Sequence, residues 1–272
     1  MKKFVYDSDL NVNACMLSDY PQYFPQHYHN YYTIGLNLKG THSLTCCYDK
    51  TFTHHILGED MFILLNPFEV HQGHGIDNLK TTYCSLSIPI NVMYKYWNQP
   101  KEKNKYLLIF QKTTVTDEDL ATKFLDFQYH VLENTTAFFN KNMQFDRIIN
   151  EIVSKYTTIK TTAIASQNLV ISSACNYITQ NYHKNFTVEE MCKQLNIKIS
   201  TLFFHFHKEF GITPQRYIMS MRIIAAKQLL KTSMPISNVA LAVGFYDHSH
   251  FTNFFKRIEG ITPLEYRHAF DF

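Results

Sequence analysis

The chain has 272 residues, of which 45% are hydrophobic and 18% are charged, and its net charge is +3. This length and composition are typical of a globular protein with two domains, and they exclude a low-complexity or fibrous chain. The six cysteines show no CxxC spacing, which excludes a dense disulfide framework and favours reduced core thiols in the cytoplasm. No stretch resembles a signal peptide or a span of about 20 apolar residues, so we expect no membrane segment.

The charge is distributed unevenly along the chain. Residues 1–165 hold 15 Lys+Arg against 16 Asp+Glu, whereas residues 166–272 hold 11 against 7. A basic second half suits a nucleic-acid partner, although solubility explains the same excess equally well.

The first predicted elements are strands, because short apolar runs with rough alternation recur in the first third of the chain. Turn residues such as Lys39-Gly40 and Asn66-Pro67 separate these runs at intervals of about ten residues. The pattern predicts an antiparallel sandwich or barrel. The runs are Thr33–Leu38, His42–Cys46, Phe52–Ile56, Met61–Leu65 and Thr82–Ile88.

Two helices are predicted after the polar stretch Asn98–Lys105, because the apolar period changes there. The first stripe is Leu120, Phe124, Phe127 and Val131, and the second is Phe145, Ile148, Ile149, Ile152, Val153 and Tyr156. Both stripes could cover the barrel, or the first could form a seam between two copies in a homodimer. The Thr- and Ser-rich segment Thr157–Ser166 is then predicted to be a linker.

An internal repeat is the strongest signal in the last third. Gly211–Tyr217 reads GITPQRY and Gly260–Tyr266 reads GITPLEY, so that five of seven positions match at a separation of 49 residues. Upstream of each copy, a short amphipathic helix, a tight turn and a second helix rich in aromatic residues recur. Two copies only, each needing a partner surface, favour a paired module over a solenoid. The repeat therefore predicts two helix-turn-helix units.

The turns carry the residues that such units need. Gly244 can adopt a positive φ where the first helix of the second unit ends, and Asn196 takes this place in the first unit. Asp247 is positioned as the N-cap of a helix that runs through about Lys256. Residues spaced i, i+4 on each second helix are predicted to face the core. They are Leu202 and Phe206 in one unit, and Phe251 and Phe255 in the other.

Two such units joined by a helix through Met219–Leu230 resemble the DNA-binding domain of the AraC/XylS family of bacterial transcription regulators. The resemblance covers about Gln167–Phe270 and rests on specific motifs. These are the AxxxGF turn at Ala240–Phe245, the Asp-x-Ser-x-Phe that follows it, the Phe254-Phe255-Lys256 ending and the GxxPxxYR close at Tyr266-Arg267.

The resemblance implies that the second helix of each unit enters a major groove, the two grooves lying about 34 Å apart on one face of the duplex. Base-facing positions carried over from the family are Ser200, Phe203 and Phe204 in the first unit, and His248, Ser249, Thr252 and Asn253 in the second. His207 and Lys256 are placed near phosphates.

The reading positions depart from the family pattern, which commonly has a polar residue and arginine where this chain has Phe203-Phe204, and arginine where it has Asn253. The phenylalanines could contact thymine methyl groups or pack against a neighbouring surface. Asn253 would prefer adenine through bidentate bonding. We therefore predict an A/T-rich site that is read mainly by the second unit.

The N-terminal part is similar to the cupin-type sensor domain of many AraC-family regulators, over roughly residues 20–90. In enzyme cupins an HxH pair, a Glu four residues on and a later His bind a metal, and here Thr33 takes the position of the Glu. His27, His29 and His71 could hydrogen-bond within the barrel, hold a metal if they converge, or line an effector pocket with Tyr31. We predict the last of these, with no metal and no cofactor.

The effector is predicted to be neutral and sugar-like, because the first 165 residues contain one arginine, Arg147, on a helix after the sheet. A clamp for a carboxylate or phosphate inside the barrel is therefore not expected, although Lys39 or Lys80 could supply a point charge.

The complete expectation is an α+β chain, with a cupin-like sensor and dimerisation domain at 1–160 and a DNA-binding domain at 166–272. It would act in the cytoplasm as an activator rather than as an enzyme, with double-stranded DNA, RNA polymerase, an effector and a second copy as its partners. Two alternatives remain: a metal-dependent cupin enzyme fused to a DNA-binding domain, and an effector-free regulator controlled by a protein partner.

Overall fold

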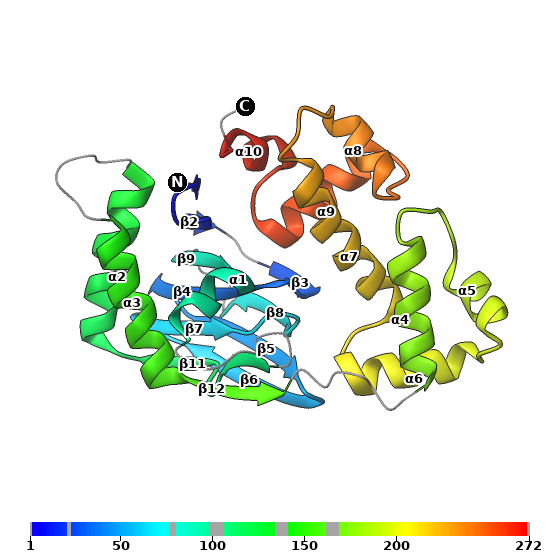
Figure 1. Cartoon of the computed structure of the whole chain (residues 1–272), viewed down its shortest axis with the longest axis horizontal. Coiled ribbons are helices and arrows are strands. Elements are labelled where there is room, and N and C mark those ends of the chain that lie inside the picture. Colours follow the sequence, from blue (N-terminus) through cyan, green and yellow to red (C-terminus); the bar gives the residue numbers. More distant parts are fainter. Residues whose placement is uncertain are drawn as a thin grey trace.

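The computed structural model describes residues 2–20, 23–76, 80–97, 106–133, 141–161 and 169–270. Antiparallel strands build its first part, and helices alone build its last part (Figure 1). The chain is therefore of the α+β class, as expected. The strands are β1 (Lys2–Asp7), β2 (Val12–Tyr20), β3 (Tyr23–His27), β4 (Tyr31–Lys39), β5 (His42–Tyr48), β6 (Thr51–Leu57), β7 (Met61–Leu65), β8 (Val70–Gly75), β9 (Thr81–Pro89), β10 (Tyr106–Phe110), β11 (Thr114–Thr116) and β12 (Thr157–Thr161).

Two main sheets form the β domain, a six-stranded one in the order β1-β2-β9-β4-β7-β11 and a four-stranded one in the order β3-β8-β5-β6. The five strands expected from the sequence correspond to β4, β5, β6, β7 and β9. Their alternation has the anticipated cause, since Tyr32, Ile34 and Leu36 of β4 are fully buried on one face. The other strands were not predicted. A short helix α1 (Ile90–Met93) and a 3-10 turn η2 (Tyr94–Tyr96) follow β9.

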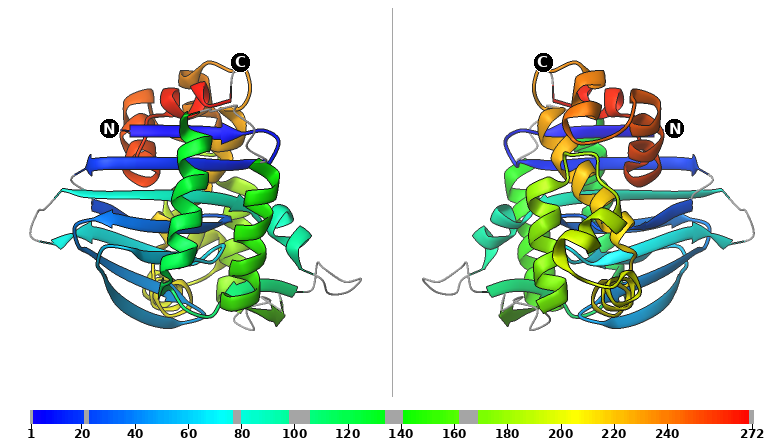
Figure 2. Two further views of the ribbon diagram at one scale, coloured as in Figure 1. Left: turned by 90° about the vertical axis from the view of Figure 1, so that its left-hand side faces the viewer. Right: turned by 90° about the vertical axis from the view of Figure 1, so that its right-hand side faces the viewer.

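Helices α2 (Glu118–Glu133) and α3 (Lys141–Tyr156) cover one side of this domain, and the C-terminal helices lie on the other (Figure 2). The whole first stripe is buried in the same core as the strands, with Phe124 and Phe127 fully covered and Phe124 packed edge-on against Phe62 of β7. The covering interpretation is therefore right. A dimer seam made of Leu120, Phe124, Phe127 and Val131 is wrong, because these side chains are already packed inside the protomer.

The predicted linker is partly a strand. Thr157–Thr161 is β12, which pairs antiparallel with β10 in a separate two-stranded sheet. Thr and β-branched side chains suit a strand as well as a linker, so composition alone could not separate the two. The rest of that segment, residues 162–166, lies outside the described residues.

The turn chemistry expected for the helix-turn-helix units is confirmed. Asn196 ends α5 with φ of 52°, and Gly244 has φ of 90°. Asp247 caps α9, because its side chain accepts a hydrogen bond of 2.7 Å from the His250 backbone N–H. The helices are α4 (Leu169–Asn181), α5 (Val188–Leu195), α6 (Ile199–Phe210), α7 (Pro214–Leu229), α8 (Ile236–Ala242), α9 (His248–Glu259) and α10 (Pro263–His268).

Each unit has its own apolar core, and the i, i+4 pairs of α6 and α9 are fully buried in them, as predicted. Helix α7 contributes to both cores, with Ile218 in the first and Ile223 in the second. Its Arg222 donates hydrogen bonds to the backbone carbonyls of Tyr182 at 2.8 Å and Lys184 at 3.0 Å, just after α4. The guanidinium therefore fastens the connecting helix to the first unit.

All six thiols are free, and all but Cys175 are buried, which agrees with the expectation of reduced core cysteines. Within the described ranges, none of the helices is both long and apolar enough to cross a membrane.

Candidate functional site

Helices α6 and α9 are the second helices of the two units, and their outward faces carry the predicted DNA-reading residues. On α9, His248, Ser249, Asn253 and Lys256 are exposed, while Thr252 is half-buried and lies 3.4 Å from the His248 ring nitrogen Nε2. This polar strip is opposite the buried Phe251 and Phe255, because the helical period separates the two faces. The strip is therefore available to a groove of DNA.

The corresponding face of α6 is less polar. Ser200 is exposed, and Phe204 is 61% exposed with the Lys208 ammonium 5.9 Å from its ring centre. Phe203 is half-buried against the core of the first unit. Phe203 therefore packs partly against the core of its unit, whereas Phe204 remains mostly exposed. His207 is exposed, but its ring lies 5.6 Å from that of Phe52 in the β domain.

The two copies of the GITP repeat dock onto the β domain. Gly211 and Gly260 end α6 and α9 in the left-handed conformation, with φ of 74° and 75°. A Cβ on Gly211 would lie 2.8 Å from Cys47, and one on Gly260 would lie 2.9 Å from Leu17. The C-terminal ends of α6 and α9 therefore abut the β domain so closely that only glycine fits.

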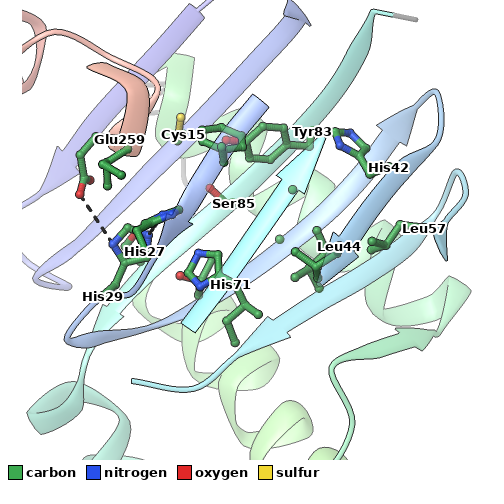
Figure 3. A pocket seen from close by; sticks show the side chains of 18 of the residues that line it. Cys15, His27, His29, His42, Leu44, Leu57, His71, Tyr83, Ser85 and Glu259 are labelled. Carbon is green, nitrogen blue, oxygen red and sulfur yellow. Dashed lines mark hydrogen bonds and ion pairs between the residues drawn. The ribbon is translucent and has the colours of Figure 1, made fainter. Parts of the chain in front are cut away.

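A cavity of about 130 Å³ lies inside the β domain and reaches the DNA-binding helices. It is lined by all four residues predicted to bind an effector, and also by Ile258 and Glu259 of α9. Figure 3 shows the three histidines at one end beside Glu259, Leu44 and Leu57 at the other, and Ser85 between them. Because α9 forms part of the wall, a molecule in this cavity touches both domains.

The three histidines form a compact, buried cluster. The Nδ1 atom of His27 lies 2.6 Å from the Pro25 carbonyl oxygen, and that of His71 lies 2.9 Å from the Glu69 carbonyl oxygen. The Nε2 atoms of His27 and His29 are 3.0 Å apart. Burial lowers the pKa of all three imidazoles, that of His71 to about 4. Their neutral forms are therefore favoured at neutral pH.

A buried ion pair ties α9 to α7 beside this cluster. The Lys227 ammonium lies 2.7 Å from Glu259 Oε2, and both side chains are less than a tenth exposed. The same ammonium donates to the Tyr31 hydroxyl at 3.1 Å and lies 4.3 Å from the Tyr31 ring centre. Burial raises the pKa of Tyr31 well above its usual value. Among the described residues, Glu259 Oε1 has no hydrogen-bond partner, and the nearest ring nitrogen is His29 Nδ1 at 3.7 Å.

All four residues predicted to bind an effector line this cavity, but Glu259 and Lys227 beside them were not predicted. Nothing in the sequence signals them, because Glu259 lies 230 residues from His29 and falls on the inner face of a helix recognised for its outer one. Thr33, the position where enzyme cupins carry a carboxylate, also lines the cavity.

Comparison with known proteins decides the family. The AraC-like ligand binding domain matches residues 14–126, and a helix-turn-helix domain matches residues 191–269. The chain belongs to the AraC family of transcription regulators. This AraC-family regulator therefore binds DNA through its helix-turn-helix domain and has a ligand-binding domain for a small molecule.

Several relatives match most of the regulator's length. The uncharacterised transcriptional regulator YbfI of Bacillus subtilis is 26% identical, over 90% of this chain and 87% of its own. The lactose operon transcription activator of Staphylococcus xylosus is 27% identical, over 80% of this chain and 78% of its own. Crystal structures of ToxT from Vibrio cholerae share the fold, one with a TM-score of 0.54 at 14% identity, over 95% of this chain and 97% of that one.

Proposed function

We propose that this regulator is an activator that reads an A/T-rich site with α6 and α9 and responds to a small neutral molecule in the cavity of its β domain. The observation that carries the proposal is the wall shared by the cavity and α9, where Glu259 of the reading helix lies beside the effector histidines. A ligand can shift an equilibrium only if it binds two states differently. Because part of α9 lines the cavity, a ligand can have different affinities for two states that differ in the placement of α9.

The proposed DNA contacts are of two chemical kinds, contacts to base edges and contacts to the phosphate backbone. Asn253, His248, Ser249 and Thr252 of α9 would read base edges, while Lys256 would contact a phosphate. On α6, the proposed base contacts are Ser200, Phe203 and Phe204, with His207 near the backbone of the duplex. The greater polarity of α9 supports the larger share of sequence reading by the second unit.

Replacing Asn253 by alanine is expected to weaken binding to the specific site roughly 5-fold to 150-fold, because a bidentate contact to adenine contributes about 1–3 kcal/mol of discrimination. Gel shifts with the specific site and with a site in which the contacted A·T pair is changed measure this effect. The preference between the two sites should vanish in the variant. Asn150→Ala, on α3 of the β domain, is the control and should bind as the unchanged protein does. Equal affinities and unchanged preference for Asn253→Ala would refute the assignment.

The proposed effector is a single sugar ring or a smaller polyol. An engineered cavity of about 150 Å³ accommodates benzene, so 130 Å³ suits one ring rather than a disaccharide. Hydroxyl, imidazole and apolar groups line it together with the Glu259 carboxylate, and neither Lys39 nor Lys80 is among its lining residues. The names of two relatives also concern sugars, those of the lactose and raffinose operons, although both sugars are larger than one ring, whereas one ToxT structure contains an unsaturated fatty acid.

Replacing Ser85 by leucine is expected to abolish the response to the effector, because the larger side chain would divide the cavity. Galactose, inositol, glycerol and oleate are the probes, and the measurements are the melting temperature and the affinity for DNA. A neutral probe at 100 times its Kd should stabilise the unchanged protein by about 2.7 kcal/mol. Ser154→Leu, on the exposed side of α3, should keep the response. Stabilisation by oleate alone would contradict a neutral effector.

The domain assignment remains part of the proposal, with residues 1–160 as sensor and 166–272 as the DNA-binding domain. RNA polymerase is proposed as the partner of the activator, supported by relatives that are named activators.

A homodimer is proposed through the outer faces of α2 and α3, where Tyr129 is 58% and Met143 45% exposed. Because the partner is chromosomal DNA, the proposed place of action is the cytoplasm. A non-enzymatic role is supported by the relatives, which are transcription regulators.

A further inference from the structure

Each of the three histidines at the cavity has a ring nitrogen that faces the other two. Candidate ligand atoms of His27, His29 and His71 all lie within 4.8 Å of one another. A tetrahedral zinc ion with Zn–N bonds of 2.0–2.1 Å needs nitrogens about 3.3 Å apart. The 3.0 Å between the Nε2 atoms of His27 and His29 is already close to this value. The candidate ligand atom of His71 lies within 4.8 Å of the other two.

The opposite nitrogens already have the partners that a metal ligand needs. A histidine that binds a metal through one nitrogen usually donates the other N–H to a carbonyl or carboxylate oxygen. The Nδ1 atoms of His27 and His71 can only donate, because a backbone carbonyl oxygen lies next to each, at 2.6 Å and 2.9 Å. When these rings are neutral, their Nε2 lone pairs are therefore free to bind an ion.

A neutral His29 ring carries one proton, and neither position of that proton satisfies both ring nitrogens. With the proton on Nδ1, its Nε2 lone pair would face that of His27 across 3.0 Å. With the proton on Nε2, its Nδ1 lone pair would face the carboxylate of Glu259 at 3.7 Å. A cation between the Nε2 atoms removes the first conflict and keeps the proton on Nδ1, where it favours a closer approach of Glu259 Oε1, a buried atom that is 3.7 Å away and has no hydrogen-bond partner among the described residues.

We propose that His27, His29 and His71 bind a divalent metal ion of the zinc type, and that Glu259 of α9 is the outer carboxylate that orients His29. Imidazole nitrogen suits zinc, and the absence of a carboxylate at Thr33 matters less for zinc than for iron or manganese. The ion would also tie the second reading helix to the β domain through His29. The three proposed metal ligands all belong to the β domain. The effect of the metal on DNA binding rests on the proposed function, in which α9 reads DNA.

Calorimetric titration of the metal-stripped full chain with Zn²⁺ is expected to show one ion per chain. His71→Ala should bind zinc at least 100-fold more weakly. The matched control is His42→Ala, which removes another histidine of the cavity wall that lies outside the cluster, and it should bind as the unchanged chain does. No binding by the unchanged chain, or an equal loss in His42→Ala, would overturn the proposal.

Cobalt substitution of the unchanged chain gives a readout that does not depend on the folding of a variant. Nitrogen-ligated tetrahedral Co²⁺ absorbs strongly in the visible range. A spectrum of hydrated cobalt would also overturn the proposal.

The role of Glu259 is tested by removing both charges of its ion pair, in Lys227→Met with Glu259→Leu, so that no buried charge is left alone. Zinc should bind this variant about 10-fold to 100-fold more weakly, the usual effect of losing an outer partner of a ligand. Glu209→Gln, at the contact with Lys50 elsewhere between the domains, should leave the affinity for zinc unchanged. Equal zinc affinities in the first variant and the unchanged chain would remove Glu259 from the site.

Gel shifts in EDTA separate this inference from the proposed function. Specific DNA binding without any zinc binding would overturn the metal site alone. Stoichiometric zinc binding without specific DNA binding would overturn the proposed reading function and leave the metal site standing.

Discussion

Lys227→Met is expected to lower the free energy of unfolding by about 3–5 kcal/mol, because it leaves the carboxylate of Glu259 buried without its cation. The lysine also donates to the Tyr31 hydroxyl, so the substitution removes a contact between α7 and the β domain. Urea unfolding followed by circular dichroism measures the loss. Sensitivity of the domain interface to protease should increase in parallel.

The double replacement Lys227→Met with Glu259→Leu is the test of this cause. Replacing both partners of a buried ion pair by apolar residues is often neutral, so the double variant should recover most of the stability. Lys155→Met is the surface control, because Lys155 pairs with Glu151 at 2.6 Å while remaining 46% exposed, and it should leave the free energy of unfolding nearly unchanged. A double variant as unstable as Lys227→Met would show that the charge imbalance is not the cause.

Gly244→Ala is expected to destabilise the helix-turn-helix domain by about 2–4 kcal/mol. A non-glycine residue at a φ of 90° costs about 1–3 kcal/mol by itself. The added Cβ would also lie 2.7 Å from the Tyr182 carbonyl oxygen and 3.0 Å from the Arg222 guanidinium. It would therefore push apart the contact that fastens α7 to the first unit. Thermal unfolding and a gel shift with the specific site should both report the damage.

Gly58→Ala is the matched control for this substitution. A Cβ at Gly58 would find only the Met61 sulfur, at 4.0 Å. The free energy of unfolding should then change by no more than about 0.5 kcal/mol. If Gly244→Ala were as mild as Gly58→Ala, the turn would be more adaptable than its contacts indicate.

The helix-turn-helix units could be predicted in detail because their determinants are local. A left-handed Asn196, a positive φ at Gly244 and an Asp247 N-cap each depend on a few neighbouring residues, so the sequence carries them directly. The strands with strong alternation were predictable for the same reason. β10 and β12 were not, since they pair with each other over a large separation in the sequence and the composition of β12 suits a linker equally well.

Only the part of the candidate site that belongs to the β domain could be predicted from the sequence. The pattern around His27 and His71 placed the histidines in the β domain, and the structure brings them together. The contact of His29 with Glu259 depends on how the two domains pack against each other, which no local periodicity records. The dimer seam failed for a related reason, because a heptad stripe such as Phe124 and Phe127 fits a sheet as well as a second helix.

The two glycines that end α6 and α9 have a consequence for the arrangement of the operator. Each is pressed against a different strand of the β domain, Gly211 against Cys47 of β5 and Gly260 against Leu17 of β2. The distance and twist between the two reading helices are then set by the β domain as well as by α7. Half-sites should accordingly tolerate base changes more readily than changes in their spacing, because five extra base pairs would turn the second groove to the far side of the double helix.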